Sequence, residues 1–288
     1  MEAALLFVAA VGGAAACPPA PPRGMIARSA PFGGVIAPTA ADADEAVVAG
    51  AVARDAARRF LGLNAPPFLI TSDPPEATPS LGGCAFAFPW PFSRHRAGAP
   101  HLPTHVLPHE IGHALFIRFL VPKTGIDEYG GGAPDWLDEM AALAFEDPAG
   151  VRMRRRDTRR LAERDALIPL ARLLSMPHPE WSARRIADSS PTGPVMAPPN
   201  SADTPAFYAT VRALLDFLIE RTGNETVVGL LAEQVRAGAP LDRWLLAHST
   251  RPAEAASLRE LDAEITAFVL TDPAYDAARR NLAPGESD

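Results

Sequence analysis

Three residues in the middle of the chain have the types and the spacing of a metal site. His109, Glu110 and His113 form the pattern H-E-x-x-H. On an α-helix, residues four apart differ by about 400° of rotation and about 6 Å of rise, so both imidazoles leave one face and can bind one ion. Glu110 lies beside them and can take a proton from water at that ion. The pattern predicts a zinc ion with Glu110 as general base.

The pattern requires a helix, and the flanking residues predict one over about 105–121. Pro122 follows, and a proline pushes the residue before it out of the helical region. Pro108 is tolerated in the first turn, where its missing N–H group costs little. A second helix is predicted over 134–145, because the side chain of Asp135 can cap its free N–H groups.

A catalytic zinc ion takes three protein ligands and keeps one open position. Residues 134–141, Pro-Asp-Trp-Leu-Asp-Glu-Met-Ala, resemble the P-x-W-L-x-E-G-x-A segment of gluzincin zinc peptidases, although Met140 replaces the usual glycine. The resemblance implies that Glu139 is the third ligand and that one Zn²⁺ is bound per chain. It also implies an α+β fold with a thermolysin- or aminopeptidase-like core. The 25 residues between His113 and Glu139 exceed the spacing common in that family.

His105 is the alternative third ligand, because it continues the four-residue spacing of the histidines. His105 and His113 are eight residues apart, which is about 12 Å along one helix. Two residues so far apart cannot share an ion bound at about 2.0–2.1 Å. We therefore expect His105 to lie outside the ligand set.

The resemblance also suggests residues around the metal ligands. Gluzincins of the aminopeptidase branch carry a tyrosine, at the head of a downstream helix, that donates to the oxyanion of the tetrahedral intermediate. Tyr208, one turn into a helix predicted over 205–222, takes this role by resemblance, but its apolar helix face equally allows a core position. Glu146, seven residues after Glu139, is a candidate partner for a ligand histidine.

A strand predicted over 84–88 lies where gluzincins carry the edge strand that pairs with substrate, and an internal strand is the alternative. Another strand is predicted over 68–71. The remaining predicted elements are helices, over about 44–61, 150–175, 225–237, 241–248 and 255–270.

The charge balance bears on possible partners. The 288 residues include 34 Asp and Glu against 27 Lys and Arg, a net charge of −7, which argues against a general nucleic-acid-binding protein. We expect one arginine-rich stretch to be a solvated helix face paired with nearby acids. Its members are Arg152, Arg154, Arg155, Arg156, Arg159 and Arg160.

The first residues predict export. Residues 3–16 form an apolar stretch of signal-peptide length, too short to span a membrane, and small residues precede Cys17. Ala14-Ala15-Ala16-Cys17 also resembles a bacterial lipoprotein cleavage site, so a lipid on Cys17 and simple cleavage after Ala16 both remain open. With Cys17 lipidated or removed, Cys84 would have no partner, and no disulfide is expected.

Together these features predict a signal peptide over 1–16, a Pro-rich tether over 17–41, a zinc-binding core over 42–148 and a helical remainder of the catalytic unit over 149–288. The hypothesis is a zinc-dependent peptidase acting on a peptide or protein, in the bacterial cell envelope or secreted. It does not bind nucleic acid, and its only membrane contact would be a lipid on Cys17. The alternative is a non-catalytic zinc-binding envelope protein that binds a protein partner.

Overall fold

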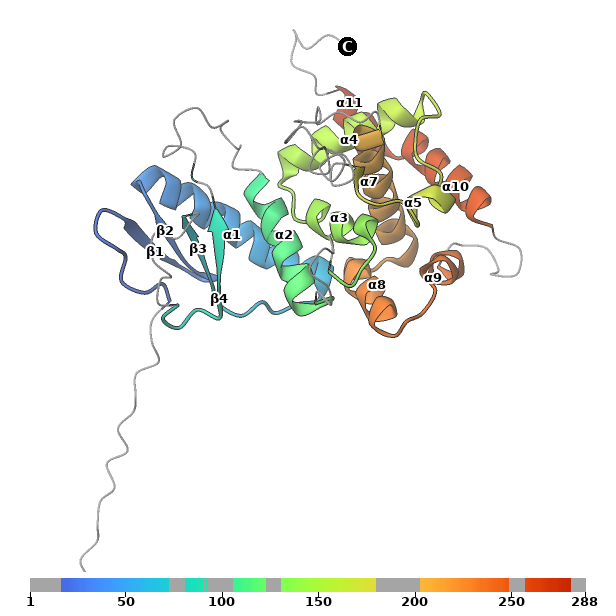
Figure 1. Cartoon of the computed structure of the whole chain (residues 1–288). Helices are drawn as coiled ribbons and strands as arrows, with labels where there is room; N and C mark the ends of the chain where they lie inside the picture. The colour runs from blue at the N-terminus through green and yellow to red at the C-terminus, as the bar shows by residue number, and fades with distance from the viewer. Residues whose placement is uncertain are drawn as a thin grey trace, which may run out of the picture. The chain divides into compact units, whose positions relative to one another are not determined.

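The computed structural model describes residues 17–72, 81–90, 92, 106–122, 131–179, 203–248 and 257–280. The chain forms two compact units (Figure 1). The first comprises Met1–Val48 and Pro66–His101, and the second comprises Ala49–Ala65 and Leu102–Asp288. The fold is α+β, as predicted, with a small mixed sheet in the first unit and helices in the second.

The first unit contains a four-stranded sheet in the order β1-β2-β3-β4. The strands are β1 (Ile26–Ala30), β2 (Gly33–Ala37), β3 (Phe68–Ser72) and β4 (Phe86–Trp90). β1 and β2 are antiparallel, whereas β2 pairs parallel with β3 and β3 pairs parallel with β4. A parallel pair needs a crossover connection, and helix α1 (Ala40–Leu61) lies in the connection between β2 and β3.

Stacked aromatic rings form much of the core of this sheet. The ring centroids of Phe32 and Phe68 are 4.9 Å apart, and those of Phe68 and Phe86 are 5.5 Å apart. Phe68 is fully buried, and its register partners are Gly33 on β2 and Phe86 on β4. The strand predicted over 68–71 is confirmed as β3. The strand predicted over 84–88 exists but begins two residues later, as β4, which is an edge strand of the described sheet.

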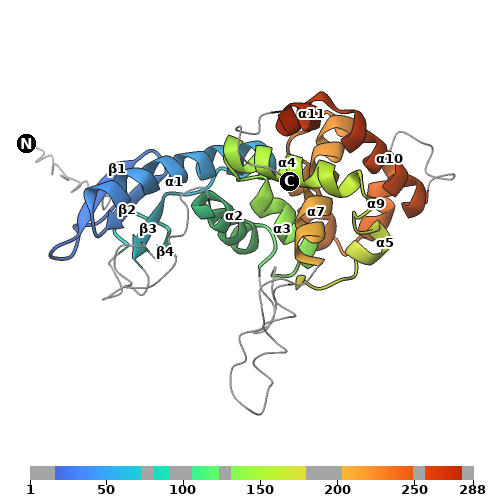
Figure 2. The same ribbon diagram turned by 90° about the horizontal axis from the view of Figure 1, so that it is seen from above.

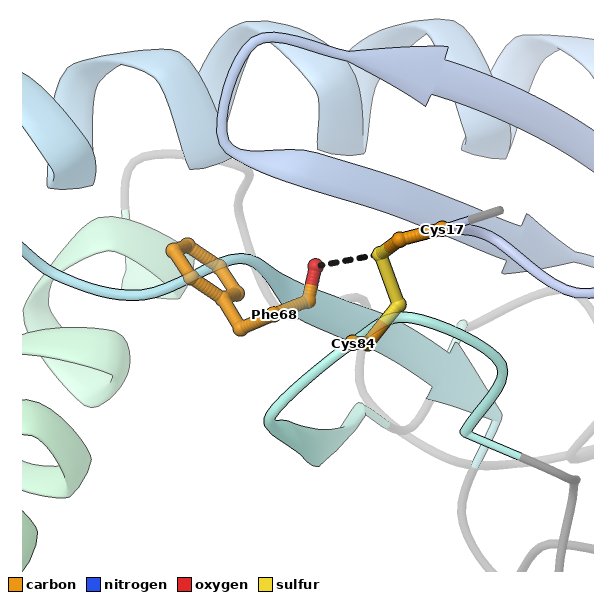
Figure 3. Close-up of a disulfide and its surroundings, with 3 residues drawn as sticks. All are labelled: Cys17, Phe68 and Cys84. Carbon is orange, nitrogen blue, oxygen red and sulfur yellow. Dashed lines mark hydrogen bonds between the residues drawn. A yellow bond between two sulfur atoms is a disulfide. The ribbon is translucent and has the colours of Figure 1, made fainter. Parts of the chain in front are cut away.

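A disulfide bond joins Cys17 to Cys84, with a Cα–Cα distance of 5.1 Å (Figure 3). The Cys17 Sγ atom also lies 3.9 Å from the carbonyl oxygen of Phe68. A Cβ atom on Gly33 would overlap that carbonyl group and lie 2.9 Å from Cys17 Sγ, and a Cβ atom on Gly34 would overlap the ring of Pro18. Glycine on β2 thus lets residues 17 and 18 pack closely against the strand.

Three expectations about the start of the chain are wrong. Residues 17–41 are not a tether, because 26–37 form β1 and β2 and helix α1 starts at Ala40. Cys84 is not a free buried thiol, because it is bonded to Cys17. A lipid on Cys17 does not agree with the structure, because one sulfur atom cannot form both the disulfide and a thioether. Residues 1–16 lie outside the described residues.

The second unit is helical and includes the C-terminal part of α1. Its other described helices are α2 (Val106–Phe119), α3 (Asp135–Leu143), α4 (Pro148–Ala162), α5 (Leu170–Leu173), α7 (Asp203–Thr222), α8 (Val227–Arg236), α9 (Leu241–Ala247), α10 (Leu258–Thr271) and α11 (Pro273–Arg280). Helix α7 is buried along its middle and packs against α3, α4, α8 and α10 (Figure 2). No described helix has the length and apolar character needed to cross a membrane.

One predicted helix of this unit is wrong in its extent. The helix predicted over 150–175 is divided into α4 and α5, because Asp165 has a φ of 54° and Pro169 forces the preceding residue out of the helical region.

The arginine-rich helix is paired with acids, as predicted. The described contacts of α4 are Arg154 with Glu146, Arg155 with Asp216, Arg156 with Asp157, and Arg159 with both Glu163 and Asp276, at 2.8–3.2 Å. These pairs neutralise much of the positive charge along α4.

The disulfide should contribute strongly to stability. Cys17 and Cys84 are 67 residues apart, and closing a loop of that length removes chain entropy equivalent to about 4 kcal/mol from the unfolded state. We predict that Cys84→Ser lowers the free energy of unfolding by about that amount in denaturant titrations. Cys17→Ser should cause an equal loss, and the double variant no further loss. Equal stability of oxidised and reduced wild type would contradict the assignment.

Candidate metal centre

The two motif histidines and Glu139 come together in the second unit. His109 and His113 lie on α2 and Glu139 lies on α3, and each offers a ligand atom within 4.8 Å of the others. His109 Nε2 is 3.2 Å from Glu139 Oε1, and His113 Nε2 is 3.7 Å from Glu139 Oε2. The group can therefore hold a metal ion.

Close packing of α2 on α3 brings these side chains together. Gly112 lies between the two histidines, and a Cβ atom there would be 3.0 Å from the Cα of Ala142 and 3.0 Å from Phe145 Cγ. Glycine therefore lets the two helices approach at the level of the ligands. Residue 112 is an x position of the H-E-x-x-H pattern and has no chemical role there. The packing of the two helices nevertheless requires a small residue at this position.

The carboxylate of Glu139 is fully buried among imidazoles without a hydrogen bond of its own among the described residues. Its side chain is 0% exposed, and neither oxygen accepts a hydrogen bond in the described part of the chain. A buried carboxylate is costly unless hydrogen bonds, an opposite charge or a metal compensate it. Two imidazoles and one carboxylate form a donor set that suits zinc and leaves one coordination position open. The residues present therefore fit the ion that the motif predicts.

Two further carboxylates lie next to the outer nitrogens of the candidate ligand histidines. His113 Nδ1 lies 2.9 Å from Asp138 Oδ2, and His109 Nδ1 lies 3.5 Å from Glu146 Oε1. Such contacts orient an imidazole and fix which nitrogen faces the metal. The predicted contact between Glu146 and a ligand histidine is therefore confirmed, whereas the sequence analysis did not identify Asp138.

The charges at this site shift the pKa values of its members. Burial lowers the pKa of His109, but the carboxylates of Glu139 and Glu146 outweigh burial and raise it to about 10. Burial likewise opposes the charge of His113, but Asp138 and Glu139 raise its pKa above the usual value. Burial opposes ionisation of Glu139, yet the histidines hold its pKa far below its usual range. Without a metal, imidazolium charge compensates the buried carboxylates.

His178 is a residue of this site that sequence reasoning missed. Its Nε2 atom lies 3.3 Å from Glu139 Oε2, and its backbone N–H group donates to Asp135 Oδ2 at 2.6 Å. Asp135 was expected to cap α3, but the residue before α3 is Pro134 and its N-terminus has no side-chain cap. The only sequence signal of His178 is its place between Pro177 and Pro179, which does not indicate a contact across 39 residues.

The other predicted site residues lie as follows. Tyr208 is half-buried on α7, with its hydroxyl 3.4 Å from His178 Nε2, so the structure places it beside the third imidazole. Glu110 is half-buried on α2, next to His109. His105 lies outside the described residues.

Comparisons of the chain with protein-family models, curated proteins and solved structures found no match.

Zinc binding can be tested without any assay of activity. We predict about one zinc ion per chain in the dialysed protein. Glu139→Gln removes one ligand charge at nearly constant shape, and we expect zinc affinity to fall by more than the roughly 10–100-fold typical of a change outside the ligand set. Metal analysis measures the zinc content, and competition with a chromophoric chelator measures the zinc affinity. Glu233→Gln, on the exposed face of α8, is the matched control. Full affinity in Glu139→Gln would exclude Glu139 as a ligand.

The raised pKa values predict opposite pH dependences for stability and zinc binding. The pKa of His109 is about 10 in the folded metal-free protein, against 6.5 for an unperturbed histidine side chain. Its contribution to stability is therefore complete below about pH 6.5 and is lost as the pH rises towards 10. Zinc must displace that proton, so its apparent affinity should rise about tenfold per pH unit between about pH 6.5 and 8.5. A flat affinity profile would show that His109 is already neutral.

Proposed function

We propose that this protein is a zinc-dependent peptidase of the gluzincin type, with a thermolysin- or aminopeptidase-like catalytic core. The observation that carries the proposal is the fully buried carboxylate of Glu139, which lies 3.2–3.7 Å from His109 and His113 and accepts no hydrogen bond in the described part of the chain. Two histidines and a glutamate leave a fourth position for water or substrate. The resemblance of the two motifs to gluzincins supports peptide bonds as the substrate.

Each residue of the site has a separate role in the proposed reaction. Bound zinc would supply Lewis acidity, which favours ionisation of a water and polarises a carbonyl group. Glu110 takes the proton of the attacking water and passes it to the leaving amine. Tyr208 can donate its hydroxyl proton in a hydrogen bond to the oxyanion. Asp138 and Glu146 keep the two ligand imidazoles in place from their outer nitrogens.

We also propose that the protein is exported to an oxidising compartment, either the bacterial cell envelope or the exterior. The Cys17–Cys84 disulfide supports this, because such bonds persist in oxidising surroundings and are rare in the cytosol. The apolar residues 3–16 supply a matching signal peptide. Mass spectrometry that finds an intact Met1 on cytoplasmic protein with both cysteines reduced would contradict this proposal.

The role of Glu110 separates a peptidase from a zinc-binding protein without activity. Glutamine has nearly the same shape as glutamate but cannot accept a proton at neutral pH. We predict that Glu110→Gln keeps the fold and the zinc, yet lowers kcat for cleavage of a mixed peptide library by about 10²–10⁴. Tyr208→Phe should lower kcat by about 10²–10³, with a smaller change in KM.

Glu233→Gln is again the control and should cleave as the wild type does. Zinc-loaded wild type that cleaves nothing in the library would favour the binding protein over the enzyme. Wild-type activity in Glu110→Gln would contradict the proposed mechanism.

A further inference from the structure

Six side chains of the second unit form a closed circuit of contacts through the candidate metal centre. From Glu139 the circuit runs to His109 at 3.2 Å and then to Glu146 at 3.5 Å. His178 closes the circuit, because its Nε2 atom lies 3.3 Å from Glu139 Oε2. Arg154 and Tyr208 complete it between Glu146 and His178. The members come from α2, α3, α4, α7 and the segments that follow α3 and α5.

Arg154 connects the two halves of this circuit. Its Nε–H group donates to Glu146 Oε1 at 2.9 Å, and its guanidinium carbon lies 4.5 Å from the centre of the Tyr208 ring. Arginine suits both contacts, because its planar group can donate along its edge and stack on an aromatic face. The Arg154 side chain is 25% exposed and Glu146 is 5% exposed, so Arg154 brings a positive charge to a carboxylate that is nearly buried and that His109 also faces.

We propose that Arg154 is a positioning residue of the metal centre, which acts through Glu146 on His109 and through Tyr208 on His178. This inference rests on the proposed metal site. Arg154 does not touch the ligands itself: it fixes the carboxylate that orients one ligand imidazole and the ring that lies against the third imidazole. The sequence analysis had placed this residue on a solvated arginine face.

Neighbouring arginines on α4 pair elsewhere and provide controls. Arg155 pairs with Asp216, and Arg159 pairs with Glu163 and Asp276, none of which belongs to the circuit. Arg152 lines a cavity of about 950 Å³ and makes no ion pair within the described ranges of the chain. Arg152→Gln therefore removes the same charge from the same helix without disturbing the metal centre.

The orientation of a ligand imidazole by outer contacts is worth about 10–100-fold in metal affinity. Arg154→Gln leaves Glu146 without its cation and Tyr208 without its stacking partner. We expect its zinc affinity to be about tenfold weaker than that of the wild type. Arg154→Lys keeps the charge but not the planar contact. Its zinc affinity should lie between that of the wild type and that of Arg154→Gln.

The experiment is zinc–chelator competition on the full chain, with thermal unfolding to confirm that each variant folds. Arg152→Gln should bind zinc as the wild type does. If Arg154 acts through Glu146, the double variant Arg154→Gln/Glu146→Gln should bind zinc no more weakly than Glu146→Gln alone. A purely structural effect of Arg154 would instead add to the loss from Glu146→Gln.

Three outcomes would overturn the inference. Equal zinc affinities of Arg154→Gln and Arg152→Gln would remove any role of Arg154 in metal binding. Full additivity with Glu146→Gln would contradict the action of Arg154 on His109 through Glu146. A wild type that binds no zinc would instead overturn the metal site itself, and with it this inference. If Arg154→Gln does not fold, the comparison of Arg154→Lys with Arg152→Gln decides the question.

Discussion

Burial of the Glu139 carboxylate is the constraint on which the second unit depends. A fully buried negative charge destabilises a fold by several kcal/mol unless an opposite charge or a metal compensates it. Here three imidazoles lie within 3.2–3.7 Å of that carboxylate, two from α2 and one from the segment after α5. Helix α2, helix α3 and the segment after α5 must therefore come together for the charge to be compensated. In the metal-free protein, protonated histidines supply the compensation.

The packing around α3 fixes the positions of the side chains that compensate this charge. Residues 136–143 of α3 are all buried, and α3 packs between α2 and α7. Gly112 permits the contact with α2, and α7 brings Tyr208 towards His178. Because the ligands are held by helices rather than by mobile loops, a metal would bind to a preformed arrangement. Its binding free energy would then add directly to the stability of this unit.

The sequence predicted the parts of the site that depend on local spacing. Histidines four apart on a helix face one direction, and the resemblance of residues 134–141 to a gluzincin segment indicated Glu139, so the three candidate ligands could be named before the structure. The strands around Phe68 and Phe86 were also predictable, because their apolar runs are short and bounded by turn residues. Local patterns of this kind do not require knowledge of the tertiary fold.

The features that the sequence did not predict depend on long-range contacts. β1 and β2 lie in a Pro- and Gly-rich stretch. β2 pairs with β3, far along the chain, and β1 pairs in turn with β2. The partner of Cys17 is 67 residues away. His178 follows α5 along the chain, and its backbone N–H group donates to the carboxylate of Asp135, the residue that was expected to cap α3. Local sequence propensities do not predict these contacts.

The most direct test of this account is the zinc K-edge absorption spectrum of the zinc-loaded chain, analysed for the ligands around the metal. The account predicts two imidazole nitrogens and carboxylate oxygen at about 2.0–2.2 Å, with water in the remaining position. A third imidazole would show that His178 closes the site, and a shell of sulfur at about 2.3 Å would place zinc on the cysteines. Either result would contradict an open centre formed by His109, His113 and Glu139.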